Sequence, residues 1–426
     1  MAGARPPILI VCYTFPPSAG IGGRRWAKFA KAFARKGHPV HVICAEPPKN
    51  NKPSYWTNDA ATLGITTHPL PRRYPMIVHR WPLINTIDRV RYHFWLHVLP
   101  LLTSGNSLDA TVFWRKPLLR KANALIQVHG IRHVIISGAP FRLLVHGLAL
   151  KEQHPDIMLL SDLRDPWTWW DNYGHGSLPR ERFAQEQALE RSVMMGSDLI
   201  ATPHQPVIDH IQSSYPKTAG KCLLVPHAID SDEVPVTPPP DRAEGFRLIY
   251  TGTLYGAAEA EDYIRALIEA FRVLEHQAPE QARRTTMTFL ITANDERKYA
   301  RMVEEAGMQE RIRFEPPVEP KEVFARIADA HAALVFIPSK NSDLIGTKFQ
   351  ELFYMGRPVI HVGEPGAVSR AIEQDHLGIS LRVAELALEL PRIILGERPF
   401  PADPKFDRSA VDLTTSADHL LTHLGL

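Results

Sequence analysis

Short apolar runs alternate with stretches of helical periodicity along most of the chain. In the first half, runs of strand length rich in Val, Ile and Leu predict β-strands. These runs lie near residues 8–13, 39–45, 132–137, 157–162, 198–202 and 222–226. Between most of them the apolar residues recur at helical spacing, which predicts helices. The expected helices lie near residues 23–36, 140–153, 178–195 and 204–213.

The second half repeats this rhythm. Its expected strands lie near residues 246–251, 286–292, 312–315, 332–337 and 357–362. Its expected helices lie near residues 260–276, 295–306, 319–328, 347–355 and 366–374. Strands that alternate with helices predict parallel sheets covered on both faces. Each half therefore has the material for a doubly wound α/β domain, which binds ligands at the carboxyl ends of its strands.

One segment interrupts the alternation. Residues 231–245, SDEVPVTPPPDRAEG, contain four prolines and no apolar periodicity. A short, polar and proline-rich stretch is typical of an interdomain linker. We therefore expect an N-terminal domain over residues 1–230 and a C-terminal domain over residues 246–400. A helical tail over residues 401–426 completes the chain and could pack back on the N-terminal domain.

Composition narrows the class of protein. The 426 residues are 44% hydrophobic and carry a net charge of +3, which is too weak a bias to indicate nucleic acid binding. Cys12, Cys44 and Cys222 are scattered, so they predict neither a disulfide framework nor a zinc site and suit a reducing cytoplasm. The N-terminal run ILIVCYTF is too short for a signal peptide, and no run approaches the length of a membrane span.

A glycine-rich turn follows the first expected strand, in the sequence TFPPSAGIGGRR of residues 14–25. Gly20 and Gly22 give G-x-G, but Arg25 stands where the dinucleotide fingerprint needs its third glycine, and the residues of a Walker loop are missing. Small residues still let backbone amides approach an anion at a helix N-terminus, and Arg24 adds donors beside Arg25. The turn is a candidate phosphate contact; the alternative is a tight turn with solvated arginines.

A second candidate lies in PSKNSDLIGTKFQELFYMGRPVIHVG, residues 338–363, which follow an apolar strand. Backbone amides around Gly346 and Thr347 predict an anion site at the start of a helix. Lys348 stands in the first turn, where it could reach a diphosphate. Glu351 is one turn further and suits a ribose diol, because a carboxylate accepts two hydrogen bonds. The alternative for Glu351 is an exposed acid favoured by the helix dipole.

Asp343 and Glu351, with seven residues between them and x-x-x-x-G-R-P-V-I after them, resemble the donor site of family-4-type glycosyltransferases. Four more segments are similar to motifs of that family, so the resemblance covers nearly the whole chain. They are TFPPSAGIGGRRWAKFAKAFARKGHPVHVI, SDLRDPWTWW of a bacterial subgroup, VPHAID before the linker, and YTGTLYG at the start of the second half. The resemblance implies the GT-B fold, in which two Rossmann-like doubly wound parallel-sheet domains face a cleft.

The resemblance also implies roles in donor binding and catalysis. Glu351 would hold the donor ribose, and Lys348 would meet the diphosphate together with the amides near Gly346 and Thr347. Asp343 would contact the transferred sugar or the reaction centre. Asp343 and Lys348 are thus candidate catalytic residues.

Six further residues are candidates for donor binding by the same resemblance. They are Gly22, Gly23, Arg24, Arg25, Gly252 and Thr253. Thr253 stands where many relatives have arginine, and no lysine follows it closely. We expect Lys348, Arg24 or Arg25 to supply the missing positive charge.

SDLRDPWTWW, residues 161–170, ends an expected strand, where a doubly wound sheet binds its ligands. Asp162, Arg164 and Trp167 are candidate acceptor-binding residues, because polar groups can orient a hydroxyl and an indole can stack on a sugar. Asp165 is a third candidate catalytic residue. The alternative is an Arg164–carboxylate pair that pins the turn, with the tryptophans packed on it.

Residues 72–121 hold nine lysines and arginines, seven aromatic residues and only two acids, Asp88 and Asp109. Basic and aromatic residues at an amphipathic surface suit anionic lipid headgroups. The same mixture could bind RNA or form an ordinary packed helix pair. Given the resemblance, we expect a membrane-facing surface for a lipid-linked acceptor, and no nucleic acid partner. A cytoplasmic protein that is peripheral at the inner face of the cell membrane would fit.

The leading hypothesis is a hexosyltransferase that uses a nucleotide-diphosphate sugar and a saccharide, lipid-linked or natural-product acceptor, in bacterial surface polysaccharide or glycoconjugate biosynthesis. Helix N-termini and cations can stabilise the departing diphosphate without a metal. We therefore expect a retaining, metal-independent enzyme with no cofactor beyond its donor substrate. The alternatives are a GT-B-fold nucleotide-sugar 2-epimerase, a non-catalytic nucleotide or lipid binder, and a dehydrogenase, against which the broken fingerprint weighs.

Overall fold

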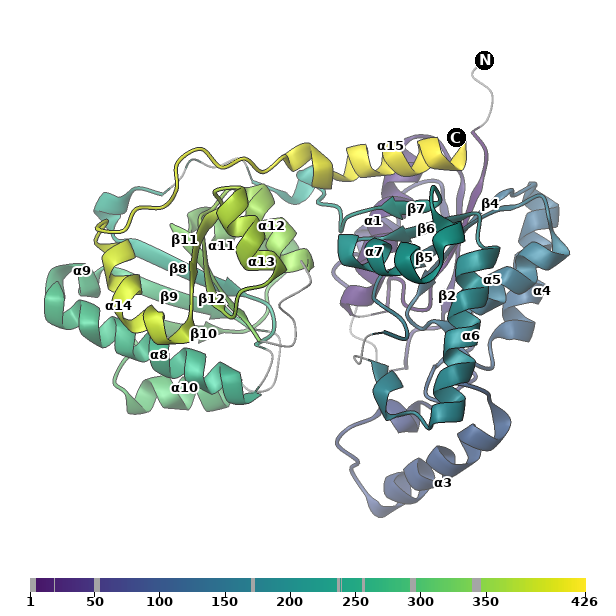
Figure 1. The fold of residues 1–426 in the computed structure, drawn as a ribbon, viewed down its shortest axis with the longest axis horizontal. Coiled ribbons are helices and arrows are strands. Elements are labelled where there is room, and N and C mark those ends of the chain that lie inside the picture. Colours follow the sequence, from purple (N-terminus) through teal and green to yellow (C-terminus); the bar gives the residue numbers. More distant parts are fainter. Residues whose placement is uncertain are drawn as a thin grey trace. The chain divides into compact units, whose positions relative to one another are not determined.

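The chain divides into two compact units, which we treat separately (Figure 1). The N-terminal unit comprises Met1–Ala228 and Leu413–Leu426, and the C-terminal unit comprises Ile229–Asp412. The computed structural model describes residues 5–18, 20–49, 54–169, 173–235, 238, 240–254, 257–291, 296–338 and 346–426.

The N-terminal unit is built on a seven-stranded sheet with the order β3-β2-β1-β4-β5-β6-β7. Every neighbouring pair of strands is parallel. The strands are β1 Ile8–Val11, β2 Val40–Ala45, β3 Ile65–Leu70, β4 His133–Gly138, β5 Met158–Leu163, β6 Leu199–Thr202 and β7 Cys222–Leu224. The helices are α1 Arg24–Arg35, α2 Thr57–Ala60, α3 Thr86–Leu102, α4 Arg115–His129, α5 Arg142–Gln153, α6 Arg180–Gly196, α7 Gln205–Ser214 and α15 Leu413–Leu424.

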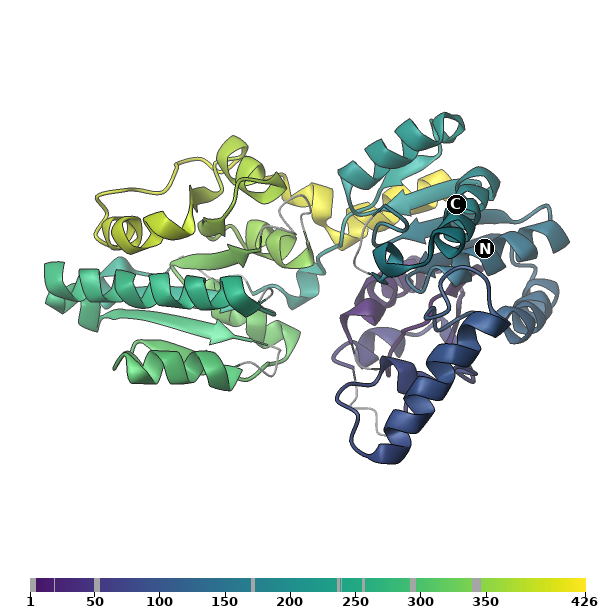
Figure 2. The ribbon, with the colours of Figure 1, turned by 60° about the horizontal axis from the view of Figure 1, so that its bottom comes forward.

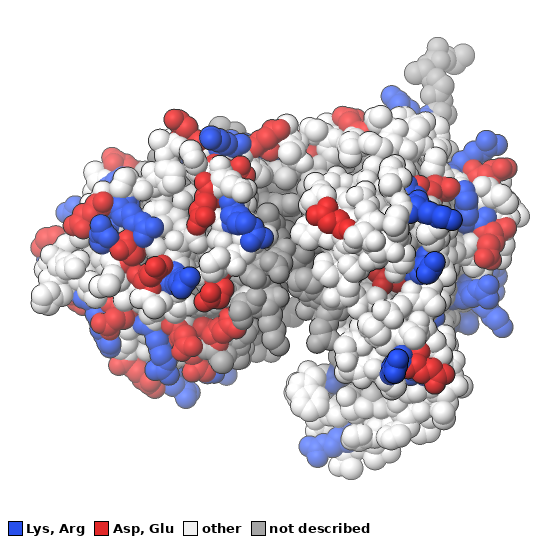
Figure 3. Space-filling model, in the orientation of Figure 1, with Lys and Arg blue, Asp and Glu red and all other residues white. Residues whose placement is uncertain are grey.

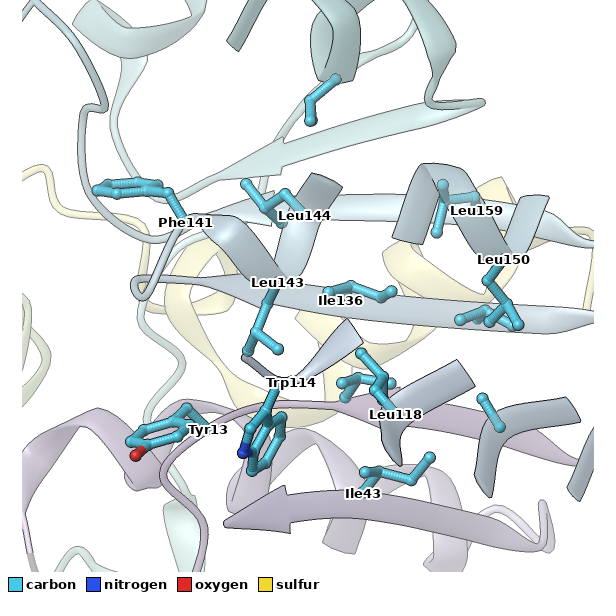
Figure 4. Close-up of a cluster of buried hydrophobic side chains, with 14 of the residues drawn as sticks. Tyr13, Ile43, Trp114, Leu118, Ile136, Phe141, Leu143, Leu144, Leu150 and Leu159 are labelled. Atoms are coloured by element: carbon cyan, nitrogen blue, oxygen red, sulfur yellow. The ribbon is translucent and has the colours of Figure 1, made fainter. Parts of the chain in front are cut away.

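Helices cover both faces of this sheet (Figure 2). Because successive side chains of a strand point to opposite faces, Leu9 of β1 joins one core cluster and Ile10 joins the other. The first cluster packs against α4 and α5 through residues such as Leu118 and Leu143 (Figure 4). The second packs against α1 and α15.

The C-terminal unit contains a six-stranded parallel sheet with the order β10-β9-β8-β11-β12-β13. Its strands are β8 Phe246–Thr251, β9 Thr285–Leu290, β10 Ile312–Glu315, β11 Ala332–Ile337, β12 Val359–Gly363 and β13 Gly378–Leu381. Its helices are α8 Ala257–Gln277, α9 Pro279–Arg283, α10 Glu296–Glu305, α11 Pro320–Asp329, α12 Thr347–Met355, α13 Ala367–Gln374 and α14 Val383–Ile394. Two core clusters again lie on opposite sides of the sheet, one with α8 and α14 and the other with α11, α12 and α13. The prediction of two doubly wound parallel-sheet domains is confirmed.

The unit boundaries differ from the predicted domain boundaries. The proline-rich segment 231–245 belongs to the C-terminal unit, where it forms the short turns Ser231–Glu233 and Arg242–Glu244. Arg242 lies over the ring of Phe246, with its guanidinium carbon 5.0 Å from the ring centroid. This segment is therefore attached to the unit that follows it.

Several elements had no clear signal in the sequence. The strand β3, ITTHPL, lies at an edge of its sheet, and most of its side chains are partly or fully exposed, so it lacks a continuous apolar run. Its proline is tolerated because an edge strand leaves one row of amides unpaired. The strand β13 and the helix α14 were also not predicted. Among the described helices, none combines the length and apolarity that crossing a bilayer requires.

The C-terminal helix α15 packs within the N-terminal unit. Ala417 and Leu420 are completely buried in the same cluster as Phe29 and Phe33 of α1. An ion pair of 2.6 Å between the Lys36 Nζ and an Asp418 carboxylate oxygen lies at the edge of this contact. The last helix is thus part of the hydrophobic core of the N-terminal unit.

We predict that Leu420→Ala lowers the free energy of unfolding of the N-terminal unit by about 2–5 kcal/mol, because it leaves a cavity in a packed core. Chemical denaturation followed by circular dichroism measures this change. The control within the same unit is Leu63→Ala, which shortens a side chain that is 95% exposed and should change stability by less than about 0.5 kcal/mol. Equal effects of the two substitutions would contradict the docking of α15.

Candidate functional site

The first candidate site lies at the carboxyl edge of the sheet in the C-terminal unit. The strand β8 ends at Thr251, and Gly252 turns the chain with a φ of +98°, a backbone conformation that favours glycine. A Cβ on Gly252 would lie 3.7 Å from the Cδ of Lys348. The predicted glycine turn therefore lies directly beside the side chain of Lys348, which comes from the start of α12.

Lys348 is held by an aromatic residue. Its Nζ donates a hydrogen bond of 3.1 Å to the Tyr250 hydroxyl and lies 4.5 Å from the centroid of the same ring. Burial lowers the pKa of Lys348 to about 8, although the nearby carboxylate of Glu351 acts in the opposite direction. This ammonium is therefore less stable than one in water, and an anion beside it would favour its charged form.

The start of α12 provides a second positive element. Gly346 is the N-cap residue and has no side chain that could accept hydrogen bonds from the amides of the first turn. Thr347 is the first residue of the helix, Lys348 follows it, and Glu351 lies partly exposed in the next turn. Backbone amides at a helix N-terminus and the helix dipole together favour an anion at this end. Asp343 lies outside the described residues.

Two tyrosines outside the predicted set of site residues support this arrangement. Tyr250 packs on Phe336, with the ring centroids 5.6 Å apart, and its hydroxyl donates to the carbonyl of Thr253 at 2.8 Å. Tyr263 stacks on the same Phe336 at 4.7 Å and donates to the carbonyl of Ile337 at 2.8 Å. The aromatic residues thus fix the ends of β8 and β11. The sequence feature that could have identified Tyr250 as a site residue is its place at the start of YTGTLYG.

The second candidate site lies at the carboxyl edge of the sheet in the N-terminal unit and centres on Asp162. Its carboxylate is completely buried and accepts a hydrogen bond of 3.0 Å from the Arg25 guanidinium. It also accepts hydrogen bonds of 2.8 Å from the Trp26 indole and the Ser137 hydroxyl. Arg25 is buried too, and its other arm donates to the carbonyl of Pro226 at 2.8 Å. These groups neutralise one another, so the predicted acceptor-binding role of Asp162 and the predicted phosphate contact of Arg25 do not fit their positions.

Arg164 and Asp165 form a second ion pair that remains partly open to solvent. Their side chains are 22% and 31% exposed, and the Arg164 Nε lies 3.0 Å from an Asp165 oxygen. The Tyr173 hydroxyl donates to the same oxygen at 2.7 Å, and burial together with Asp165 raises the pKa of Tyr173 to about 12. The arrangement matches the pinned turn considered from the sequence, while both charged groups stay within reach of a ligand.

Close packing explains the two central glycines of the opening loop. A Cβ on Gly22 would lie 2.8 Å from the Arg164 guanidinium, which donates to the Gly22 carbonyl at 3.2 Å. A Cβ on Gly23 would lie 3.3 Å from the Cα of Phe15. Arg24, the first residue of α1, is buried as well. The arginines of this loop are thus not solvated. A phosphate contact by Gly22, Gly23 and Arg24 stays a prediction.

Trp167 occupies the core of the N-terminal unit. Its side chain is completely buried and stacks on Phe141, with the ring centroids 5.0 Å apart. The indole donates to a carboxylate oxygen of Glu186 at 2.9 Å. An indole enclosed in this way has no face open to a sugar, so the predicted stacking of an acceptor on Trp167 does not fit this structure.

Two histidines outside the predicted set of site residues lie near these charged groups. His204 follows β6 and His227 follows β7, and their rings are 5.9 Å apart. Burial lowers the pKa of His204 to about 4. Burial and the positive charge of Arg25 lower the pKa of His227 well below its usual range. Both imidazoles are therefore neutral near pH 7. Their positions after two parallel strands were the signal that could have identified them.

Comparisons with known proteins support the architecture. No family model matches the sequence, and no curated protein matches it significantly. A glycosyltransferase of known structure from Rickettsia africae is 11% identical, with 99% of this chain and 98% of that chain aligned and a TM-score of 0.63. The HepE protein of Anabaena, solved in complex with UDP and glucose, is 14% identical, with 99% and 100% aligned and a TM-score of 0.59.

A putative UDP-N-acetylglucosamine 2-epimerase from Listeria monocytogenes also has a similar structure. It is 12% identical, with 98% of this chain and 95% of that chain aligned and a TM-score of 0.57. At such low identities the similarity establishes the fold alone. The chain therefore has the GT-B fold, as the resemblance implied.

We predict that Asp162→Ala lowers the free energy of unfolding of the N-terminal unit by about 3–5 kcal/mol, because it leaves the Arg25 charge buried without its partner. Asp165→Ala, which breaks the partly exposed pair, should lower it by no more than about 1 kcal/mol. Urea denaturation of both variants measures the difference. If Asp162→Ala lowered the free energy of unfolding no more than Asp165→Ala does, the buried ion pair would not stabilise this unit as we infer.

Proposed function

We propose that this protein is a glycosyltransferase that moves a sugar from a nucleotide-diphosphate sugar to a saccharide, lipid-linked or natural-product acceptor. The observation that carries the proposal is the position of Lys348 on Tyr250, at the N-terminus of α12 and beside the turn at Gly252. A lysine and the amides of a helix N-terminus at the carboxyl edge of a doubly wound sheet suit a diphosphate. The GT-B fold and the sequence resemblance support the same assignment.

The donor would bind to the C-terminal unit by contacts of two kinds. The amides at the start of α12 and the Lys348 ammonium would bind the diphosphate oxygens. Glu351, one helical turn away, would accept hydrogen bonds from the ribose hydroxyls. The resemblance gives Asp343 a contact with the transferred sugar, and the acceptor role falls to the N-terminal unit, where Arg164 and Asp165 remain accessible.

We infer a retaining transfer in which the acceptor oxygen attacks from the side that the diphosphate leaves. The bond between the anomeric carbon and the diphosphate oxygen breaks, and the bond to the acceptor oxygen forms. The acceptor proton passes to an oxygen of the released diphosphate. Lys348 and the helix amides would stabilise the negative charge that develops on this leaving group, which is the work a metal performs in other transferases. The proposal therefore requires no metal.

The experiment that tests the function is a thermal-shift screen against UDP-, GDP-, dTDP- and ADP-sugars, followed by turnover of the best binder. Stabilisation by one donor class and net loss of that donor with an acceptor would support a transferase. The similarity to a putative 2-epimerase keeps that reaction as the alternative. An epimerase would convert the donor to its isomer without any acceptor. Stabilisation only by NAD would overturn the assignment.

We predict that Lys348→Met lowers the affinity for the nucleotide-sugar roughly 10- to 100-fold, because a charge-assisted hydrogen bond contributes about 1.5–3 kcal/mol. The affinity for the bare nucleoside should not change. Glu351→Gln should weaken the nucleoside and the nucleotide-sugar by the same factor. Isothermal titration calorimetry with both ligands distinguishes the two roles. The matched control is Lys321→Met, on the exposed surface of α11.

We also predict that donor affinity falls as the pH rises from 7 to 9. Lys348 has a pKa of about 8 in the free protein, so its charged form is abundant at pH 7 and scarce at pH 9. A diphosphate binds the charged form, and binding must therefore take up a proton at high pH. Titrations across this range measure the loss. Lys348→Met should remove this pH dependence, and a dependence that survives the substitution would contradict the role of Lys348.

A further inference from the structure

The region 72–121 does not present its aromatic residues together at the surface. Tyr74 and Trp114 are buried in the core of the N-terminal unit, whereas Trp81 and Phe94 are exposed. The expected mixed basic and aromatic surface therefore does not include Tyr74 and Trp114. What the surface presents instead is one apolar face of the helix α3.

This face consists of side chains that recur along α3 at helical spacing. Ile87, Val90, Phe94 and Leu101 are 69%, 64%, 56% and 83% exposed. They follow one another three, four and seven residues apart, which places them on one side of a helix. The helix lies at the margin of the N-terminal unit, away from its sheet (Figures 1 and 2). On the side that Figure 3 shows, uncharged side chains predominate at this end of the unit, with a few charged side chains among them.

A different face attaches α3 to the protein. Leu99 is completely buried, and Trp95 and Leu96 pack against the core. At the C-terminal end of the helix, Arg182 of α6 donates hydrogen bonds of 2.9 Å to the carbonyls of Pro100 and Thr103. The exposed apolar residues are thus not needed to dock the helix. Scattered exposed apolar residues are ordinary, but apolar residues gathered on one helix face mark an interaction surface.

The segment just before α3 contributes two more exposed apolar side chains. Trp81 and Ile84 are 82% and 70% exposed. Tryptophan prefers the level of the lipid headgroups, where an apolar ring with one polar nitrogen is well accommodated. We call Trp81, Ile84, Ile87, Val90, Phe94 and Leu101 the α3 stripe.

The charges around the α3 stripe indicate what it binds. Residues 72–102 contain five arginines and one acid. That acid, Asp88, is buried and lies 3.3 Å from the Arg80 guanidinium. Arg89 and Arg91 are exposed on α3 itself. An apolar face flanked by arginines complements an anionic lipid surface. A nucleic acid would use the arginines but not the aliphatic side chains.

We propose that the α3 stripe inserts into the interface of an anionic lipid bilayer, with α3 lying in the plane of the membrane. The arginines bind the lipid phosphates, and the stripe enters the boundary between headgroups and acyl chains. The inference goes beyond the proposed sugar transfer and does not depend on it. If both hold, the N-terminal unit is held at the surface where a lipid-linked acceptor resides.

The test is flotation of the full chain with vesicles made of equal parts phosphatidylcholine and phosphatidylglycerol. The wild type should float with these vesicles, and more weakly with phosphatidylcholine alone. The double variant Ile87→Ser/Phe94→Ser should lose at least about tenfold in partitioning, because two large apolar side chains no longer enter the interface. The matched control is Leu63→Ser/Leu388→Ser, which removes side chains that are 95% and 65% exposed outside the stripe.

Circular dichroism and the melting temperature establish that both double variants remain folded. Wild-type protein that stays at the bottom of the gradient would overturn the proposal, and so would equal flotation of wild type and Ile87→Ser/Phe94→Ser. A dimer in solution that the same substitutions disperse, without vesicle binding, would assign the stripe to a second copy instead. Flotation without sugar turnover would sustain this inference while the proposed transferase failed.

Discussion

The carboxylate of Asp162 is completely buried at the carboxyl end of β5, where Arg25, Trp26 and Ser137 all donate to it. These donors come from the start of α1 and the end of β4, so one charge connects three elements that converge at the carboxyl edge of the sheet. The cost of desolvating the carboxylate is met only if every donor is in place. This contact fixes the start of α1 against the end of β5, and it thereby positions the glycine loop before α1 and the turn after β5. The Arg164–Asp165 pair belongs to that turn.

In the described part of the C-terminal unit, the side chain that holds the candidate charge, Lys348, contacts an aromatic residue instead of a carboxylate partner of the Asp162 kind. Lys348 rests on the ring and hydroxyl of Tyr250, and burial lowers its pKa to about 8. An aromatic ring and a phenol position an ammonium without neutralising it, so its charge stays available to an anion. In the N-terminal unit, by contrast, the Arg25 charge is neutralised by Asp162. At the carboxyl edge of the N-terminal sheet, the Arg25 charge thus stabilises the fold. At the carboxyl edge of the C-terminal sheet, the Lys348 charge is positioned where an anion could bind.

The N-terminal unit has two different surface features, the polar carboxyl edge of its sheet and the apolar α3 stripe. Its sheet edge holds polar groups in fixed positions, whereas α3 exposes apolar side chains that the core does not need. Both features depend on the attachment of surrounding helices, since Arg182 of α6 fixes the end of α3 and Glu186 of the same helix binds the Trp167 indole. A surface for lipid and a polar edge for chemistry would then share one rigid support.

The sequence by itself determined the alternation of strands and helices, the two doubly wound sheets, and the placement of Lys348 and Glu351 in the first turns of one helix. These features are local, because periodicity and helix-start signals act over a few residues. Only the tertiary structure decided that Arg25 and Asp162 neutralise each other, that Trp167 is enclosed, and that the last helix joins the N-terminal core. These three features depend on contacts between residues that are far apart in the chain. A local sequence pattern therefore does not indicate which charged or aromatic side chain is paired in the fold and which stays accessible to a ligand.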